Sequence, residues 1–147
     1  YSHDYAKVYA SVDAYFQDLD QIGQMVQEEI GYVPCFIRFP GGSSNTVSKK
    51  YTAGIMSTLV QEVQNRGYQY YDWNGSSGDG SVRTTEELVA QATSFDSNNI
   101  ILLCHDSHGK QTTVEALPQI IEHYQSLGYT FKALDRDSFV AHHGVNN

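Results

Sequence analysis

The sequence predicts an α/β fold in which parallel strands alternate with helices. Short apolar runs alternate with segments of helical periodicity along the whole chain. Three of the apolar runs are followed directly by ionisable or aromatic residues, the usual place for catalytic groups in α/β proteins. The 147 residues suit one domain spanning 1–147. We therefore expect a single domain with one site shared by three loops.

The first half of the chain alternates two helices with two strands. We expect helices where apolar residues recur every three or four positions, and strands where apolar residues run together. Gly31 and Gly67 follow the two helical segments, where helices commonly end, and Pro40 closes the first apolar run. The expected elements are a helix over 8–26, a strand over 35–39, a helix over 55–63 and a strand over 68–73.

The second half repeats this alternation. A Thr followed three residues later by a Glu is the spacing of a capping box, and it occurs at Thr84 and again at Thr112. Pro118 fits the second of these helices only within its first turn or so, where a missing N–H is tolerated. The expected elements are a helix over 84–92, a strand over 100–104, a helix over 112–124 and a strand over 129–134.

This order permits two closures, an open doubly wound sheet or part of a (β/α) barrel. A complete barrel takes about 250 residues, so four strands do not close one. The chain also opens on a helix directly behind His3. That order places His3 in a loop after a strand that precedes Tyr1, so the first strands of the fold are expected to be missing.

The composition narrows the classes of partner. A net charge of -8 argues against nucleic acid and anionic membranes, which require a basic surface. No apolar run approaches the length of a membrane span. Cys35 and Cys104 lie in apolar runs and are expected to be buried thiols, and a disulfide would require neighbouring strands. Cysteine usage therefore does not settle the compartment.

Three loops carry the candidate catalytic residues. Arg38 precedes a Pro-Gly-Gly turn, where a guanidinium can orient a carboxylate and the N–H groups of Gly41 and Gly42 are free to bind an oxyanion. Asp72, beside Trp73, can hold a histidine in one tautomer. His105 follows an apolar run, which suits a histidine tuned for proton transfer.

Each of these residues alone has a simpler explanation: a surface arginine, a loop aspartate, a structural histidine. Their occurrence in three successive loops favours a catalytic site. His3, His105 and His108 are also possible metal ligands, although their spacing matches no standard zinc pattern. His142 and His143 are expected to be exposed to solvent. The sequon at Asn74 is a pattern frequent by chance.

In order along the chain, these motifs resemble polysaccharide deacetylases of the NodB-homology type (carbohydrate esterase family four), particularly bacterial peptidoglycan N-acetylglucosamine deacetylases. Ser2-His3 resembles the end of the family's His-Ser/Thr-x-x-His metal motif. The stretch 38–42 fits Arg-x-Pro-x-Gly, Asp72-Trp73 fits the second half of Asp-x-x-Asp-Trp, and 103–105 fits Leu-x-His. The resemblance implies the C-terminal portion of a NodB-type (β/α) barrel, with 1–147 belonging to a single catalytic domain.

The resemblance also implies a role for each matched residue around a glycan and a divalent metal, often zinc. The implied roles are metal ligand for His3, orientation of the catalytic base for Arg38, oxyanion binding for Gly41, support of the catalytic histidine for Asp72, groove lining for Trp73, the floor of the acetyl-methyl pocket for Leu103, and general acid for His105.

The chain departs from the family pattern in three places. The Thr-Phe-Asp-Asp motif, which supplies the base and a metal-binding carboxylate, is absent, and the first histidine of the metal pair falls before Tyr1. Gln69 stands at the first Asp of Asp-x-x-Asp-Trp. One ligand does not hold zinc tightly. We therefore expect the 147-residue chain alone to be inactive and to bind no stoichiometric metal.

Three hypotheses remain for the function. The first is metal-dependent hydrolysis of N-acetyl groups from a glycan, outside the cell or in the cell envelope. Peptidoglycan is favoured by the stretch 39–45, and chitin oligosaccharides or acetylxylan are the alternatives. The second is a non-catalytic glycan-binding module or pseudoenzyme of the same fold. The third is an unrelated open-sheet protein whose motif matches are accidental. The sequence does not indicate an oligomeric state.

Overall fold

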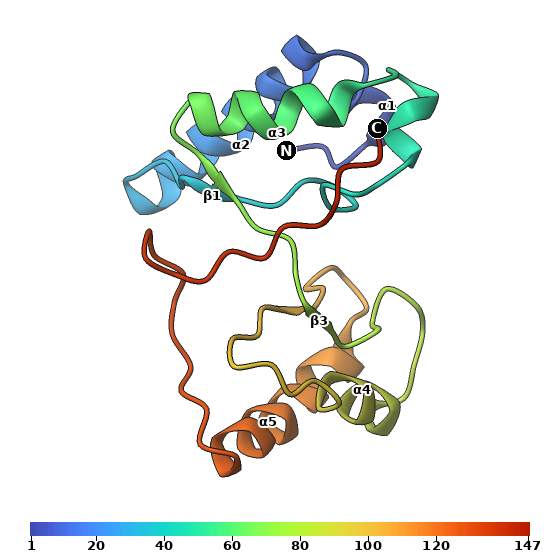
Figure 1. Ribbon diagram of the computed structural model, residues 1–147, viewed down its shortest axis with the longest axis vertical. Coiled ribbons are helices and arrows are strands. Elements are labelled where there is room, and N and C mark those ends of the chain that lie inside the picture. Colours follow the sequence, from blue (N-terminus) through green and yellow to red (C-terminus); the bar gives the residue numbers. More distant parts are fainter. The chain divides into compact units, whose positions relative to one another are not determined.

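The computed structural model describes residues 1–147, which form two compact units. Unit 1 contains residues 1–72 and 142–147, and unit 2 contains residues 73–141. Figure 1 shows the helices of unit 1 in blue to green and those of unit 2 in yellow to orange. Each unit has its own apolar core and its own pair of parallel strands.

Unit 1 begins with helices that are capped as their sequences suggest. The Asp4 side chain accepts the N–H of Ala6 at the start of the first helix, and the Ser11 side chain caps the second. Gly31 ends the second helix in the left-handed conformation. The elements of unit 1 are α1 (Tyr5–Val8), α2 (Val12–Ile30), β1 (Phe36–Ile37), η1 (Val47–Lys50), α3 (Ile55–Asn65) and β2 (Gln69–Tyr70).

The core of unit 1 is rich in aromatic rings. β1 and β2 pair in parallel, with Phe36 opposite Gln69 and Ile37 opposite Tyr70. The buried side chains of this core come from α1, α2, α3, β2 and the loops, and they are Val8, Tyr9, Tyr15, Phe16, Phe39, Ile55, Met56, Leu59, Val63 and Tyr70. The parallel pairing and the two amphipathic helices predicted for this half of the chain are confirmed, except that the first begins at Val12 rather than at Val8, which belongs to α1.

Unit 2 packs two helices beside a second parallel pair. Its elements are β3 (Gly75–Ser76), α4 (Thr85–Ala92), β4 (Leu102–Leu103) and α5 (Gln111–Ser126). β3 and β4 pair in parallel, with Gly75 opposite Leu102. The capping box predicted at Thr84 is present, since its side chain accepts the Glu87 N–H and the Glu87 side chain accepts the Thr84 N–H.

The last helix differs from its prediction at two positions. α5 begins at Gln111, and Glu115 closes no capping box with Thr112, because its carboxylate accepts hydrogen bonds from Thr85 and from Gln111. Pro118 is the eighth residue of α5 and lies in its interior. It removes one N–H from the helix, but the buried face of α5 packs against α4 and holds the helix together.

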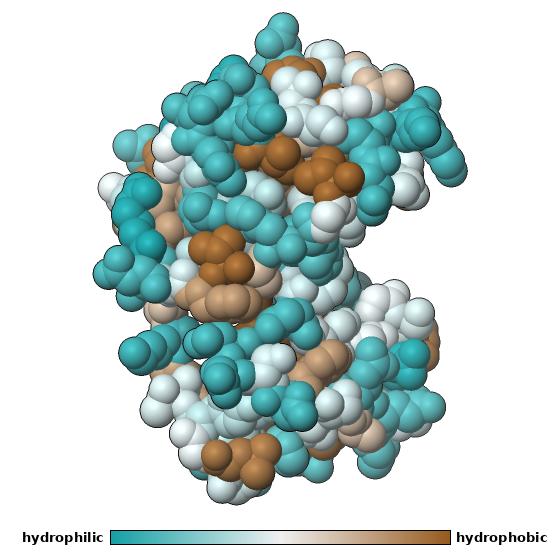
Figure 2. Space-filling view, in the orientation of Figure 1, coloured by the Kyte–Doolittle hydropathy of each residue, from teal (hydrophilic) through white to brown (hydrophobic).

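The strand predicted over 129–134 does not form. Tyr129 packs beside Tyr124 and donates its hydroxyl to the Ser97 carbonyl, whereas Phe131 and Leu134 are exposed. An apolar run becomes a strand only where another strand supplies the hydrogen-bonding ladder, and the described residues supply none there. In each unit some large apolar side chains remain on the surface (Figure 2). No helix of the chain is long and apolar enough to cross a bilayer.

Candidate active site

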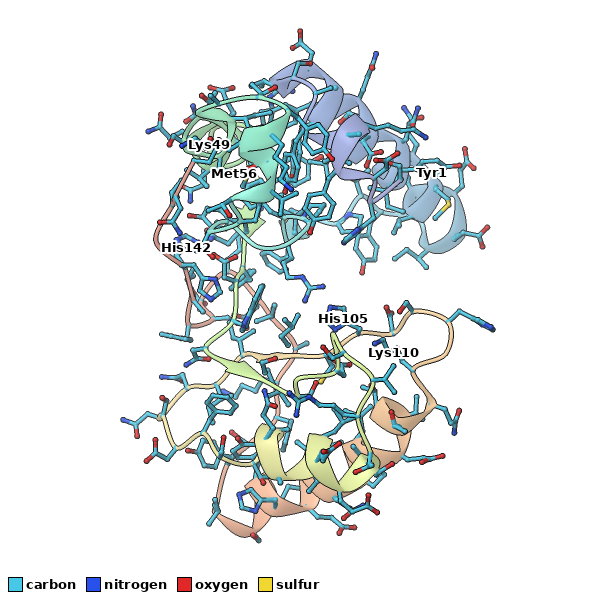
Figure 3. All side chains as sticks on the ribbon, turned by 90° about the vertical axis from the view of Figure 1, so that its right-hand side faces the viewer. Tyr1, Lys49, Met56, His105, Lys110 and His142 are labelled. Carbon is cyan, nitrogen blue, oxygen red and sulfur yellow. The ribbon has the colours of Figure 1, made fainter.

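His105 and Asp79 meet at the carboxyl ends of the two strands of unit 2. β3 and β4 are parallel neighbours, so the loops that follow them emerge at the same edge. One Asp79 carboxylate oxygen lies 2.7 Å from the Nδ1 of His105, and the other accepts the His105 backbone N–H at 2.7 Å. Figure 3 shows His105 and Lys110 on the chain that follows β4. A single carboxylate thus fixes both the main chain and the ring of His105.

The Asp79 carboxylate is itself held tightly. Its side chain is 2% exposed and also accepts the Thr113 hydroxyl at 2.9 Å, while Lys110 donates to the Asp79 backbone carbonyl. Burial raises the pKa of the Asp79 carboxyl, but the hydrogen bonds donated by His105 and its other neighbours lower that pKa by more. The net pKa lies below the usual value, so Asp79 is an anion at neutral pH.

This arrangement determines what the His105 ring can do. A carboxylate only accepts hydrogen bonds, so Nδ1 carries the proton that points at Asp79, and Nε2 is the nitrogen left for other chemistry. The His105 side chain is 38% exposed, in contrast to the buried carboxylate behind it. The pair can therefore give or take a proton at Nε2 while the carboxylate stabilises the charged ring.

Two glycines shape the loop that carries Asp79. Gly78 has φ +79°, and a Cβ there would lie 2.4 Å from the side-chain oxygen of Gln91. Gly80 stands beside the ring of His105, and a Cβ there would have no neighbour closer than the Cε1 of His105 at 3.8 Å. The loop therefore depends on glycine at position 78 and leaves open space at position 80.

The support of His105 is the main correction to the sequence prediction. The resemblance implied this role for Asp72, but its carboxylate accepts hydrogen bonds within unit 1, from the Ser43 N–H at 2.8 Å and the His143 N–H at 2.9 Å. The Ser43 hydroxyl also donates to it, at 2.5 Å. Asp72 is thus a buried structural carboxylate, and Asp79 holds the histidine.

The family motif matches the sequence around Asp79 poorly. If the second Asp of the motif Asp-x-x-Asp-Trp is aligned with Asp79, Ser76 stands at the first Asp and Gly80 stands at the Trp. Only one of the three specified residues then matches. Asp79 follows β3, and the parallel pairing of β3 with β4, which the sequence alone does not show, brings this loop to the end of the strand that precedes His105.

The turn after β1 is rigid. Phe39 is fully buried, the Tyr9 hydroxyl donates to the Pro40 carbonyl at 2.7 Å, and the Gly42 N–H donates to the Phe39 carbonyl. Gly42 therefore has no N–H to offer a ligand. Gly41, with φ +76°, is exposed and makes no hydrogen bond within the chain, which leaves its N–H available.

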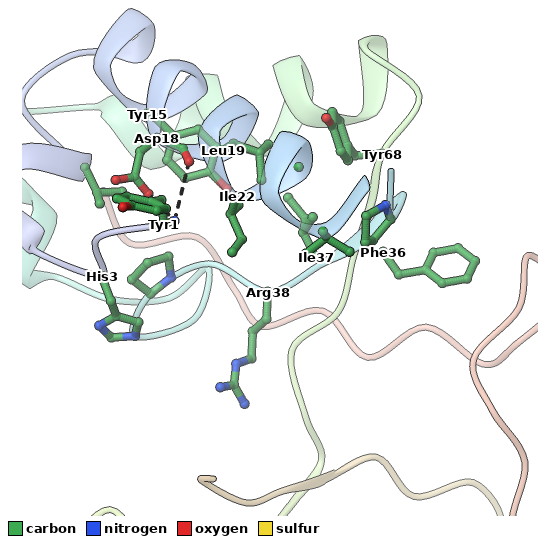
Figure 4. A pocket seen from close by; sticks show the side chains of 15 residues that line it. Tyr1, His3, Tyr15, Asp18, Leu19, Ile22, Phe36, Ile37, Arg38 and Tyr68 are labelled. Atoms are coloured by element: carbon green, nitrogen blue, oxygen red, sulfur yellow. Dashed lines mark hydrogen bonds and ion pairs between the residues drawn. The ribbon is translucent and has the colours of Figure 1, made fainter. Parts of the chain in front are cut away.

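Arg38 lies at the rim of a cavity in unit 1. The cavity has a volume of about 420 Å³, and its lining is largely apolar, including Leu19, Ile22 and Phe36. Figure 4 shows the Arg38 side chain pointing away from the labelled side chains of α2, with His3 to its left in this view. Arg38 is exposed. Its predicted role in orienting a carboxylate remains a prediction.

His3 does not complete a metal site with other residues of the chain. Its imidazole packs edge-on against Tyr5, with ring centroids 5.8 Å apart. Asp18, another residue of the cavity, accepts the Tyr1 ammonium at 2.6 Å and the Ser2 N–H. No group of three or more His, Cys, Asp or Glu side chains is placed to hold a metal ion. The residues present therefore do not fit a zinc site, which takes at least three protein ligands.

The other residues that the sequence singled out have ordinary surroundings. Leu103 lies half-buried in β4, and its carbonyl accepts the N–H and the hydroxyl of Ser77. Trp73 is half-buried. The side-chain amide of Asn74 bridges the Asn99 carbonyl and the Ile101 N–H, so the sequon nitrogen is already bonded. The lining roles of Leu103 and Trp73 remain predictions.

The predicted exposure of the two C-terminal histidines and the predicted burial of the two cysteines hold only in part. His142 is exposed as expected, but its ring also stacks on Tyr70 at 3.8 Å between centroids. His143 is half-buried rather than exposed, because its N–H binds a buried carboxylate. Cys35 and Cys104 are half-buried and form no disulfide.

Comparisons with known proteins agree on one kind of enzyme. No protein-family model matches the chain. The putative polysaccharide deacetylase YheN of Bacillus subtilis is 23% identical over 150 residues, which cover 97% of this chain and 49% of that protein. The bifunctional xylanase/deacetylase of Pseudobutyrivibrio xylanivorans is 36% identical over 109 residues, which cover 72% of this chain and 17% of that protein. The chain spans about half or less of these curated relatives.

A solved structure extends the likeness to the whole chain. The catalytic domain of peptidoglycan N-acetylglucosamine deacetylase from Eubacterium rectale is 45% identical and superposes with a TM-score of 0.95. The match covers 99% of this chain and 67% of that one. The predicted fold class, part of a NodB-type (β/α) barrel with parallel strands alternating with helices, is thereby confirmed.

Proposed function

This chain belongs to the NodB-homology polysaccharide deacetylases (carbohydrate esterase family four), and we propose that it serves the hydrolysis of N-acetyl groups on a glycan. The observation that carries the proposal is the buried Asp79 carboxylate bound to Nδ1 of His105, whose ring is partly exposed. Hydrolysis of an acetamide needs an acid for the departing amine, and a supported histidine is suited to that task.

In the proposed reaction, His105 is the general acid. A catalytic base takes a proton from water as the water oxygen adds to the acetyl carbon. The carbon–nitrogen bond then breaks as the sugar nitrogen takes a proton from Nε2 of His105, and the acetic acid released loses its own proton to solvent. The products are acetate and a free amine. Asp79 keeps Nδ1 protonated throughout and stabilises the charged form of the ring before the transfer. Without the proton from Nε2, the sugar nitrogen would have to leave as an amide anion, which is far too basic to depart.

The roles implied for other matched residues belong to the proposal as well. The exposed N–H of Gly41 would bind the oxyanion, and Arg38 would orient the catalytic base. Trp73 and Leu103 would contact the sugar and its acetyl methyl group. A divalent metal, with zinc as the first candidate, is proposed for a complete catalytic domain. Among the residues of this chain, only His3 corresponds to the family's metal motif.

For the substrate, we propose N-acetylglucosamine of peptidoglycan. The support is the identity of 45% to a domain described as a peptidoglycan N-acetylglucosamine deacetylase. Acetylxylan and chitin oligosaccharides are the alternatives, the first because a xylanase/deacetylase is also related. An enzyme acting on peptidoglycan would work outside the cell or in its envelope, which we propose as the location.

The experiment is an acetate-release assay on peptidoglycan fragments, chitin oligosaccharides and acetylxylan. It compares the 147-residue chain, which we expect to be inactive alone, with any longer natural form of the protein. In the active form, His105→Ala should lower kcat by about 10²–10⁴. Lys132→Ala, at an exposed position of the same unit, is the control and should keep full activity. Retained activity in His105→Ala would sink the proposal, and glycan binding without acetate release would favour a binding module.

A further inference from the structure

Lys110 occupies a position for which its residue type is poorly suited. It is the N-cap of α5, where Ser, Thr, Asp or Asn normally accepts a first-turn N–H, and it makes no such bond. A positive charge at a helix N-terminus also opposes the helix dipole. A residue that goes against both local preferences calls for a tertiary explanation.

The explanation is the contact that Lys110 makes with Asp79. The Lys110 ammonium donates to the backbone carbonyl of Asp79, the residue whose carboxylate holds His105. Lys110 is half-buried, and its own N–H donates to the Ser107 carbonyl at 3.2 Å, which closes the turn between the two residues.

The loop after β4 is therefore fastened to Asp79 at both ends. At the first end, His105 binds the two carboxylate oxygens through its N–H and its ring. At the other end, Lys110 binds the carbonyl, and Thr113 in the first turn of α5 binds the carboxylate again. The residues between these ends, 106–109, are exposed and have no buried side chain to hold them.

We propose that Lys110 is a positioning residue for proton transfer at His105. By holding the Asp79 main chain against the start of α5, it keeps the Asp79–His105 pair in one geometry and so fixes the direction of Nε2. This role rests on the proposed function of His105 as the general acid. A residue that only stabilises the fold could make the same hydrogen bond. The measurements below therefore distinguish loss of His105 alignment from loss of stability.

The first measurement does not depend on activity. Hydrogen exchange of the His105 ring Nδ1–H and backbone N–H is followed by NMR in the 147-residue chain. Lys110→Met, which keeps the stem and removes the donor, should speed both exchanges at least about tenfold. Lys110→Arg, which keeps a donor, should restore slow exchange, and the exposed Lys132→Met is the control. Equal exchange in all three variants would overturn the proposal.

The second measurement uses the active form of the protein. Lys110→Met should lower kcat by about 10- to 100-fold with KM within about twofold, because the loss concerns alignment rather than substrate binding. Thermal unfolding compared with Lys132→Met shows whether the fold is intact, and Lys110→Leu, which also lacks a donor, replaces Lys110→Met if that variant does not fold. Unchanged kcat despite faster exchange would also overturn the proposal. Absence of acetate release in every variant would contradict the proposed function and leave the exchange result standing.

Discussion

Asp72 and Asp79 are both buried aspartates, but their carboxylates bind different kinds of hydrogen-bond donor. Asp72 in unit 1 is 1% exposed, and Asp79 in unit 2 is 2% exposed. The donors around Asp72 are two backbone N–H groups and a serine hydroxyl. The donors around Asp79 include a ring nitrogen of His105. Burial and saturation with hydrogen bonds are common to both, so neither property identifies the functional carboxylate.

What separates the two is the chemistry of the donor. None of the groups bound to Asp72 gains or loses a proton near neutral pH, so that carboxylate ties the turn after β1 and the segment 142–147 to the end of β2. The donor bound to Asp79 is an imidazole, a group that can give or take a proton in catalysis. A buried carboxylate therefore indicates a site when its partner is both titratable and partly exposed, as His105 is.

The strongest test of this comparison is Asp79→Asn. An amide can donate to Nδ1, which opposes protonation of that nitrogen and so disfavours the charged ring. Nε2 would then carry the proton of a neutral imidazole, which is a far weaker acid. We expect kcat in the active form to fall by about 10²–10⁴. Acetate release from the preferred glycan measures the effect. If Asp79→Asn and Asp72→Asn lowered kcat equally, the distinction between the two carboxylates would be wrong.

Asp72→Asn should show the opposite pattern. The amide nitrogen would face donors and leave at least one of them unpaired in a buried place. We expect a loss of about 2–4 kcal/mol in the free energy of unfolding. Urea denaturation followed by far-UV circular dichroism measures this loss. In the fraction that remains folded, kcat should change by less than about twofold; a larger loss of kcat would give Asp72 a catalytic role after all.

The glycine that shapes the Asp79 loop offers a smaller perturbation. Gly78→Ala places a Cβ 2.4 Å from the Gln91 side chain at φ +79°, which should cost about 1–3 kcal/mol in stability. Adding Gln91→Ala should recover the share of this stability loss that comes from the steric clash, and leave the share that comes from the backbone conformation. Gly80→Ala has open space and should change stability by less than about 0.5 kcal/mol. Thermal unfolding of the four proteins decides whether the loop is as constrained as its backbone indicates.

Much of this fold could be predicted from the sequence. Helical periodicity, the stop at Gly31 and the capping box at Thr84 mark α2 and α4 because these signals are local. β3 could not be found in the same way. Its residues are Gly75 and Ser76, which carry no apolar signal, and only their pairing with β4 makes them a strand.

Of the candidate site, His105 could be predicted from the sequence, but the carboxylate that supports it could not. His105 stands out because it directly follows an apolar run, but its partner depends on the pairing of β3 with β4. The resemblance placed the supporting carboxylate at Asp72 because Trp73 follows it, as in the family motif. The hydrogen bonds show that Asp79, followed by a glycine, has that role. Pairing across strands is a tertiary property, and a short motif match does not determine it.

The smallest expected effect is the pH dependence of the Asp79 contribution to stability. Burial raises its pKa and the hydrogen bonds lower it by more, so the opposing effects leave the folded-state pKa below the unfolded value of about 3.9. The sign follows from linkage: the ionised carboxylate stabilises the fold above the unfolded pKa, and this contribution is lost as pH falls through the folded pKa. The difference in unfolding free energy between the unmodified chain and Asp79→Asn should therefore be largest at neutral pH and shrink below about pH 4. Urea denaturation at a series of pH values measures it, and a difference that stayed constant down to pH 3 would show that Asp79 contributes through packing rather than through its charge.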